Sequence, residues 1–324
     1  MKTGQKFASV ALLLWGAVLP LGADPGAPGM LAVTGALSTH DPTIAKVTNY
    51  YVRVASGRGI PIATSPDLLT WTTAGQVFAT NPAWTSQQIP GSTDLWAPDL
   101  VLRDGQWRLY YAVSTFGSNR SAIGLAVNSH LDPVHPEQGW EDLGSVFETF
   151  PTSDVNAIDP QIASDGKRDW LVFGSFWSGI RLVPLDASGK VLAGEVPQPL
   201  AQRPDPPDAI EGAFLYRHGE WYYLFVSFDF CCKGLQSTYN IRVGRSKNLT
   251  GPYTDREGIG MLRGGGTLVK AKGSRDIGPG HNSILVDGTR EYLVYHVYDV
   301  QIAGTSRLRI QQLTWDAQGW PVAP

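Results

Sequence analysis

Four acidic residues, each at the start of a separate apolar segment, could together carry out acid–base chemistry. They are Asp41, Asp99, Asp159 and Glu211. Carboxylates that share a pocket raise one another's proton affinity, because two negative charges at short range cannot both ionise freely. One group can then hold a proton while another stays ionised, as acid–base catalysis requires. Because hydrolysis of a glycosidic bond uses one carboxylic acid and one carboxylate, these residue types predict a glycoside-cleaving site.

A turn-shaping role is the alternative for any single acidic residue, since Asp before Pro is common in turns. Asp41-Pro42 and Asp159-Pro160 both fit that description. Two further copies of the pattern carry Glu211-Gly212 and His281-Asn282, where no proline follows. The recurrence of a polar residue therefore favours a shared site.

The acidic residues belong to a unit that recurs five times at a spacing of about 50 to 70 residues, so a repeat architecture is considered first. Each copy begins with a tripeptide that carries a polar residue, and about ten residues later reaches an aromatic-rich strand. The tripeptides are His40-Asp41-Pro42, Ala97-Pro98-Asp99, Ile158-Asp159-Pro160, Ile210-Glu211-Gly212 and Gly280-His281-Asn282. The aromatic runs occupy 50–54, 107–111, 170–173, 221–225 and 292–295.

Each copy is predicted to form four strands, with Asp-Gly or His-Gly turns between the first two in most copies. Third strands are expected near 60–63, 122–126, 179–182, 241–244 and 308–311, and weaker fourth strands near 76–78, 145–147, 190–192, 266–268 and 320–322. Five such units predict an all-β, five-bladed β-propeller with its active site at one mouth of the central channel. Two packed β-sandwiches are the alternative, but they do not explain a polar position that recurs in register. Whether residues 31–37 close the ring stays open.

Composition and the N-terminus limit the partners and the location of the protein. A net charge of -3 implies no basic face, so neither nucleic acid nor an anionic membrane is expected as a partner. Lys2 and Lys6 precede an apolar run that is shorter than a membrane span and is interrupted by Pro20, which favours a signal peptide over an anchor. We predict a signal peptide at 1–23, a linker at 24–35 and a catalytic propeller at 36–324, and we expect a secreted or periplasmic monomer.

The two cysteines, Cys231 and Cys232, are adjacent in the chain. Neighbouring cysteines constrain no long loop, so they are either two thiols or a vicinal disulfide that shapes the segment 228–234. A metal site built from them is disfavoured because no further cysteine completes a ligand set.

Seven motifs in order resemble glycoside hydrolase family 43, and specifically its arabinanases, over nearly all of the chain after the predicted signal peptide. They are 39–42 (THDP), 95–99 (LWAPD), 156–160 (NAIDP), 174–180 (GSFWSGI), 210–212 (IEG), 227–234 (SFDFCCKG) and 278–283 (GPGHNS). The resemblance implies an inverting hydrolase of α-1,5-linked L-arabinan. By motif match, Asp41 is the general base, Glu211 the general acid, and Asp159 the residue that orients the acid and raises its pKa. Inversion requires the base and acid to stand about 6.5 to 9.5 Å apart, with water between them.

The resemblance also implies a cation and a set of substrate contacts. His281 matches a histidine that holds calcium or a similar cation at the channel axis, largely through waters; one histidine alone is a weak motif for a hard cation. Exposed aromatic side chains can stack on sugar rings, although blade packing is the alternative for any of them. The expected substrate-binding residues are His40, Trp96, Asp99, Phe116, Asn156, Ser175, Trp177, His296 and Arg309. Arg309 could instead pair with one of the catalytic carboxylates.

Three other functions remain possible on the same fold. An arabinofuranosidase or β-xylosidase of the same family would change only the substrate. A fructan-cleaving propeller would retain configuration, with carboxylates about 5 to 5.5 Å apart. A non-catalytic sugar-binding propeller would need no acid–base pair, which the presence of both Asp41 and Glu211 disfavours. The sequence does not show whether cleavage is internal or from chain ends, or whether linear or branched arabinan is preferred.

Overall fold

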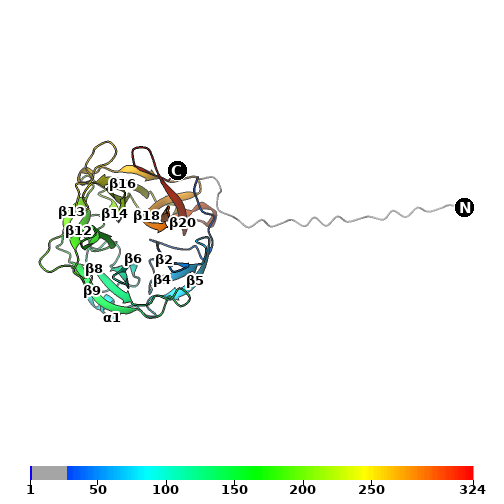
Figure 1. Cartoon of the computed structure of the whole chain (residues 1–324), viewed down its shortest axis with the longest axis horizontal. Coiled ribbons are helices and arrows are strands. Elements are labelled where there is room, and N and C mark those ends of the chain that lie inside the picture. The colour runs from blue at the N-terminus through cyan, green and yellow to red at the C-terminus, as the bar shows by residue number, and fades with distance from the viewer. Residues whose placement is uncertain (2–27, 324) are drawn as a thin grey trace.

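The computed structural model describes Met1 and residues 28–323, and over these residues the chain forms five β-sheets arranged around a central axis (Figure 1). Each sheet is one blade, so the predicted five-bladed propeller is confirmed. The predicted signal peptide, apart from Met1, lies outside the described residues. Within the described part of the chain, no helix is long and apolar enough to cross a membrane.

Each blade is built from consecutive strands that pair antiparallel in chain order, with the first strand innermost. Blade one has β2 (Thr43–Val47), β3 (Tyr50–Val54), β4 (Pro61–Ser65) and β5 (Thr70–Gln76), with β1 (Thr34–Gly35) added outside. Blade two has β6 (Trp96–Arg103), β7 (Gln106–Val113), β8 (Ser121–Asn128) and β9 (Glu141–Thr149). Blade three has β10 (Gln161–Ser164), β11 (Asp169–Phe173), β12 (Ile180–Pro184) and β13 (Gln198–Ala201).

The last two blades follow the same plan. Blade four has β14 (Ile210–His218), β15 (Trp221–Phe228), β16 (Asn240–Ser246) and β17 (Thr267–Lys270). Blade five has β18 (Asp276–Asp287), β19 (Arg290–Asp299), β20 (Thr305–Trp315) and β21 (Pro321–Val322). The helical segments are short: α1 (Ala83–Gln88), η1 (Gly234–Gln236), η2 (Met261–Arg263) and η3 (Val300–Ile302).

The hairpin between β6 and β7 shows how local sequence sets the register. Asp104 and Gly105 both have positive φ, at 50° and 75°, and they join the paired residues Arg103 and Gln106. A two-residue loop with positive φ at both positions matches the twist of the flanking strands. The same turn residues recur in other blades, so the predicted hairpins form where expected.

The fourth strand of blade three differs from the prediction. It forms at Gln198–Ala201 and not at 190–192, where Val191 makes a single bridge to Leu185. Asp186 caps a tight turn by accepting hydrogen bonds from the backbone N–H groups of Ser188 and Lys190. After this turn the chain runs antiparallel to the preceding strand for only one bridge. The true strand contains Pro199, which an outermost strand tolerates because one of its edges needs no partner. In blade one the fourth strand is Thr70–Gln76, not 76–78.

The segment that begins the described chain closes the ring. Leu31 donates its backbone N–H to Ile310 of β20, and Leu308 donates to Leu37, while β1 pairs parallel with β5. One stretch therefore lies between blade five and blade one and hydrogen-bonds to both. Residues 28–35, within the range expected to be a linker, take part in this pairing.

The hydrophobic core is a ring of five clusters, and each cluster lies between two neighbouring blades. Tyr111 of β7 packs with Val52 and Ile62 of blade one, for example, and Tyr223 of β15 packs with Leu293 and Tyr295 of blade five. Aromatic second strands are buried on both faces, which explains why they read as continuous apolar runs in the sequence. This packing holds the inner strands in a ring around the channel.

Candidate active site

A shared backbone conformation marks the true equivalent position in the five blades. Near the start of each innermost strand one residue has positive φ: Asp41 (49°), Ala97 (44°), Asp159 (58°), Gly212 (58°) and His281 (47°). Positive φ is uncommon for residues other than glycine and is retained where the surroundings enforce it. Glu211 therefore precedes the equivalent position by one residue and Asp99 follows it by two. The prediction that one polar residue recurs in register was wrong for these two.

In four of the five blades, the side chain two residues further on hydrogen-bonds to the next blade. The Thr43 hydroxyl donates to the Pro98 carbonyl, and the Ser283 hydroxyl donates to the Pro42 carbonyl. Asp99 belongs to this set, because its Oδ2 accepts the backbone N–H of Ile162 at 2.8 Å. Burial raises the pKa of Asp99 to about 6, against the effects of that hydrogen bond and of Arg103. Asp99 ties blade two to blade three and lines neither of the cavities described next.

Two adjoining cavities form a cleft at the channel mouth. One, of about 590 Å³, is lined on blades two to four by aromatic side chains that include Phe176, Trp177 and Phe230. The other, of about 350 Å³, contains Asp41, Asp159 and His281. Six residues line both cavities and so mark where they meet: Trp96, Phe116, Ile158, Glu211, Cys231 and Cys232. A mainly apolar cavity that opens into one lined by carboxyl groups and histidines suits a sugar chain.

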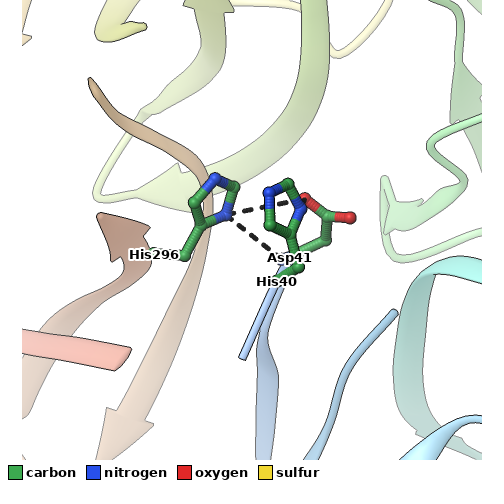
Figure 2. A group of neighbouring side chains, drawn as sticks. All are labelled: His40, Asp41 and His296. Carbon is green, nitrogen blue, oxygen red and sulfur yellow. Dashed lines mark hydrogen bonds and ion pairs between the residues drawn. The ribbon is translucent and has the colours of Figure 1, made fainter. Parts of the chain in front are cut away.

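Asp41 is surrounded by histidines, of which Figure 2 shows His40 and His296. Its Oδ1 lies 3.0 Å from Nδ1 of His40 and 3.2 Å from Nδ1 of His281. Burial favours the neutral acid, yet the charges of His40 and His281 hold the pKa of Asp41 well below its usual range. Ser56 also donates its hydroxyl to Oδ2. Asp41 is thus ionised at neutral pH and can accept a proton.

His296 supports the backbone of Asp41. Its Nδ1 accepts the Asp41 backbone N–H at 3.2 Å, and its ring stacks on His40 with centroids 3.9 Å apart (Figure 2). Burial, reinforced by the neighbouring His40, holds the pKa of His296 well below its usual range, so this ring is neutral. His296 is fully buried and does not line the cleft, in contrast to its predicted role in substrate binding.

Glu211 is held by two hydroxyl groups. Ser175 donates to its Oε2 at 2.6 Å, and Tyr239 donates to its Oε1. Burial, followed by the charge of Glu211, raises the pKa of Tyr239 well above its usual range, so the hydroxyl keeps its proton. Both donors are neutral, and they fix the orientation of a carboxyl group that faces both cavities.

Asp159 is next to Glu211 and has a different proton affinity from Asp41. Its Oδ2 accepts the backbone N–H of Gly212 at 2.9 Å. Burial raises the pKa of Asp159 to about 7; His281 opposes this rise, and the charges of Glu211 and Asp41 add to it. One carboxyl group in the cleft is therefore ionised while another holds a proton for much of the time at neutral pH. Such a divergence is typical of acid–base sites.

The structure brings most of the predicted substrate-binding residues to the cleft. Six line it: His40, Trp96, Phe116, Asn156, Ser175 and Trp177. Phe116 and Trp177 are exposed, at 83% and 36% of their surface, as stacking on a sugar requires. Arg309 is elsewhere, because its guanidinium binds Asp276 and Asp299 inside blade five. The prediction that Arg309 pairs with a catalytic carboxylate was wrong.

Sequence reasoning missed three side chains that support the carboxylates: Ser56, Tyr239 and Tyr298. The Tyr298 hydroxyl is 2.7 Å from Nε2 of His40, which connects it to Asp41. A signal for Ser56 was present, since a serine recurs at or just after the end of the second strand in four blades, at Ser56, Ser114, Ser175 and Ser227. Tyr239 and Tyr298 give no comparable signal because they reach the site only through folding.

The surroundings of His281 suit a hydrated cation better than a directly ligated one. Among the described residues, one group of three potential metal ligands lies close together: His40, Asp41 and His296. These side chains hydrogen-bond within the group. Calcium prefers six to eight oxygen ligands, which this group does not supply. The Asn282 side-chain amide, next to His281, is buried and has no hydrogen-bond partner within residues 28–323. The Asn282 side-chain oxygen would suit a water molecule of a hydrated ion, because it can accept a hydrogen bond.

A five-bladed propeller whose channel mouth presents carboxyl groups of unequal proton affinity has the features of a glycoside hydrolase. Comparison with known families agrees with this class. The chain belongs to the glycosyl hydrolases family 43, whose family model matches residues 32–321.

Characterised relatives resemble the chain along most of its length. The extracellular endo-α-(1→5)-L-arabinanase 1 of Bacillus subtilis is 41% identical over 303 residues, which cover 91% of each chain. The extracellular exo-α-(1→5)-L-arabinofuranosidase of Cellvibrio japonicus is 38% identical over 305 residues, 88% of this chain and 86% of the relative. The α-L-arabinanase of Cellvibrio cellulosa, solved with arabinohexaose, has a TM-score of 0.85 at 38% identity and covers 89% of this chain and 95% of that one.

Proposed function

We propose that this protein hydrolyses α-1,5-L-arabinofuranosidic bonds of arabinan with inversion at the anomeric carbon. The observation that carries the proposal is the position of Glu211 at the junction of the two cavities, with Asp41 in one of them only. A sugar chain that occupies both cavities would place one of its bonds beside Glu211. The names of the relatives, which include arabinanases of both endo and exo type, support arabinan as the substrate.

In the proposed reaction Asp41 is the general base and Glu211 the general acid. Ionised Asp41 takes a proton from a water molecule, whose oxygen attacks the anomeric carbon. The glycosidic C–O bond breaks as Glu211 gives its proton to the leaving oxygen, so charge balances and the configuration inverts. Asp41 lies in blade one and Glu211 in blade four, which is consistent with attack and departure on opposite faces of the sugar.

Asp159 acts as the positioning residue for the acid. Its carboxyl group accepts the backbone N–H of Gly212, the residue after Glu211. The carboxyl groups of Asp159 and Glu211 are close enough for their charges to interact. Ser175 and Tyr239 fix the two oxygens of Glu211 from the other side. Trp96, Phe116 and Trp177 supply the apolar surface on which arabinose rings lie.

The decisive test uses linear 1,5-arabinan with the wild type, Asp41→Asn and Glu211→Gln. The wild type should release sugar whose anomeric proton signals show inversion, and both variants should bind arabinan but lose hydrolysis. Retention of configuration would contradict the assignment of Asp41 as the general base. Xylo-oligosaccharides and fructans serve as control substrates, and their faster cleavage would move the enzyme to one of the alternative activities.

The sizes of the first products distinguish internal from terminal cleavage. Early mixed oligomers indicate internal cuts, whereas a single small product indicates cuts from a chain end. We propose the endo mode, after the arabinanase resemblance, and the time course tests it directly.

We also propose that His281 anchors a hydrated calcium ion, which would supply positive charge beside the carboxyl groups. Elemental analysis after dialysis and a thermal shift on adding calcium test this without using activity. A matched His281→Asn variant should lose the calcium-dependent shift. An equal shift in both proteins would contradict the assignment.

The predicted signal peptide and the extracellular relatives support export of the mature chain, and we propose that it is a monomer. N-terminal sequencing of the exported protein should find cleavage after Ala23. Size-exclusion chromatography with light scattering should give the mass of one chain.

A further inference from the structure

Tyr298 lies behind the proposed general base, between His40 and the loop after β15 (residues 229–239). It is near the end of β19, two residues after His296, so both side chains point to the same face of that strand. The Tyr298 hydroxyl oxygen is 2.7 Å from Nε2 of His40, and the His296 ring stacks on the same imidazole (Figure 2). His40 is therefore held at its edge by Tyr298 and on its face by His296.

The Tyr298 hydroxyl also accepts hydrogen bonds from that loop. The backbone N–H of Cys232, which forms a vicinal disulfide with Cys231, donates to it at 2.7 Å, and the Ser237 hydroxyl is a second donor. Burial raises the pKa of Tyr298 to about 12, although the Cys232 hydrogen bond opposes the rise, so the hydroxyl keeps its proton. A phenol oxygen has two acceptor sites and one donor. With both acceptor sites taken, the O–H points at Nε2 of His40.

His40 connects this hydroxyl to Asp41. Nδ1 of His40 is 3.0 Å from Oδ1 of Asp41, which is ionised and can only accept, so Nδ1 carries a proton. When the ring is neutral, its Nε2 accepts the Tyr298 O–H. When the ring is protonated, the Ser237 hydroxyl has to turn away so that the Tyr298 oxygen can accept from Nε2. In both states the ring is bonded at both nitrogens, and Nδ1–H faces the carboxylate.

A glycine makes room for this arrangement. Gly278 has a positive φ of 55°, and a Cβ atom there would lie 2.7 Å from Cβ of Ser237 and 3.2 Å from Cδ2 of Tyr298. The first of these distances is shorter than Cβ atoms adopt in proteins. The first glycine of the 278–283 motif thus lets Ser237 and Tyr298 approach each other.

We propose that Tyr298 is a positioning residue that orients the general base Asp41 through His40. This inference rests on the proposed function, because Asp41 is the base of that reaction. A base must face the water molecule whose proton it accepts, and its orientation is held only when the groups behind it are themselves fixed. One Asp41 oxygen accepts Nδ1–H of His40 and the other accepts the Ser56 hydroxyl. Loss of the phenol hydroxyl would leave Nε2 of His40 without its partner, so the ring could tilt and release one of these oxygens.

The kinetic test is Tyr298→Phe, which removes the hydroxyl and keeps the ring. With linear 1,5-arabinan, kcat should fall about ten- to a hundredfold, because the orientation of the base matters in the transition state. KM should change by no more than about twofold. The loop keeps its own hydrogen bonds, from the Lys233 N–H to the Ser237 hydroxyl and from the Phe230 N–H to the Thr238 hydroxyl.

Tyr295→Phe is the matched control. Tyr295 is on the same strand and fully buried, and its hydroxyl bonds to Gln311, which lines neither cavity of the cleft. The same chemical change at this position should leave kcat and KM unchanged.

NMR of protein labelled with nitrogen-15 in its histidine rings measures the orientation of His40 without substrate. The chain has six histidines, so the His40 signals are identified by their absence from His40→Asn. The wild type and Tyr295→Phe should show a His40 Nδ1–H signal that exchanges slowly with water. Tyr298→Phe should lose this signal.

Two results would overturn the proposal. One is an unchanged kcat in Tyr298→Phe. The other is a lower kcat with the His40 Nδ1–H signal intact, which would show that Tyr298 does not act through His40. If the wild type shows the expected His40 signal but does not cleave arabinan, the proposed function fails instead, so the two failures are distinguishable.

Discussion

Replacement of Asp159 by asparagine should stabilise the protein in a pH-dependent manner. Burial raises the pKa of Asp159 from an ordinary 3.8 to about 7, so the folded protein binds this proton more tightly than the unfolded chain does. Stability is therefore lost as pH rises from the unfolded value towards the folded one. The asparagine side chain would be uncharged throughout, with an oxygen that can still accept the Gly212 N–H, so the variant avoids that loss.

The size of the effect follows from the same pKa. Between pH 5 and pH 7 the wild type should lose about 2 to 3 kcal/mol relative to the Asp159→Asn variant, since each pH unit is worth about 1.4 kcal/mol. For a chain of this size that corresponds to a melting-temperature gap that widens by about 3 to 5 °C. Above about pH 8 the gap should stop growing, because Asp159 is then ionised in the folded protein as well.

Thermal unfolding followed by circular dichroism from pH 5 to pH 8 measures this gap. A chelator in every sample keeps any bound cation from shifting the titration. A gap that does not change with pH, or a variant that loses stability relative to the wild type as pH rises, would refute the reasoning. The same variant should lose most of its arabinan hydrolysis, so stability and activity would move in opposite directions.

Three further substitutions separate structural from functional side chains. Asp99→Asn should also gain stability relative to the wild type as pH rises towards about 6. It should keep full hydrolysis in a reducing-sugar assay, because Asp99 binds the Ile162 N–H outside the cleft. A large loss of activity would contradict this placement. Ser175→Ala should lower kcat/KM about ten- to a hundredfold by removing a hydroxyl hydrogen bond to the Glu211 carboxyl group. An unchanged kcat/KM in steady-state kinetics would show that Ser175 does not support Glu211. Trp177→Ala should raise KM several-fold with kcat nearly unchanged, the pattern of lost uniform binding, and an unchanged KM would place Trp177 outside the binding surface.

The repeat in the sequence was enough to predict the fold. Aromatic second strands and Asp-Gly turns are local features, and each copy carries them, so five blades could be counted without coordinates. The edge strand of blade three was misplaced because edge strands carry weak patterning: Pro199 lies in the real strand, and Val191 lies in a segment that makes only one bridge.

The equivalence of the acidic positions could not be predicted correctly in every blade. Alignment on polar side chains grouped Asp99 and Glu211 with Asp41 and Asp159. Alignment on proline would have placed Ala97 beside Asp41, since Ala97-Pro98 matches Asp41-Pro42. The backbone shows that Ala97 and Gly212 are the true equivalents, because they share the positive φ.

By itself the sequence determined the residue types, the spacing of the repeats and hence the ring that brings Asp41, Asp159 and Glu211 to one channel mouth. The tertiary structure alone decided which atoms surround each carboxyl group. Tyr239 reaches Glu211, and His296 reaches the Asp41 backbone from the far end of the chain, through contacts that no local pattern encodes. Proton affinity depends on burial and on charges a few ångströms away, so the different behaviour of these carboxyl groups exists only in the folded ring.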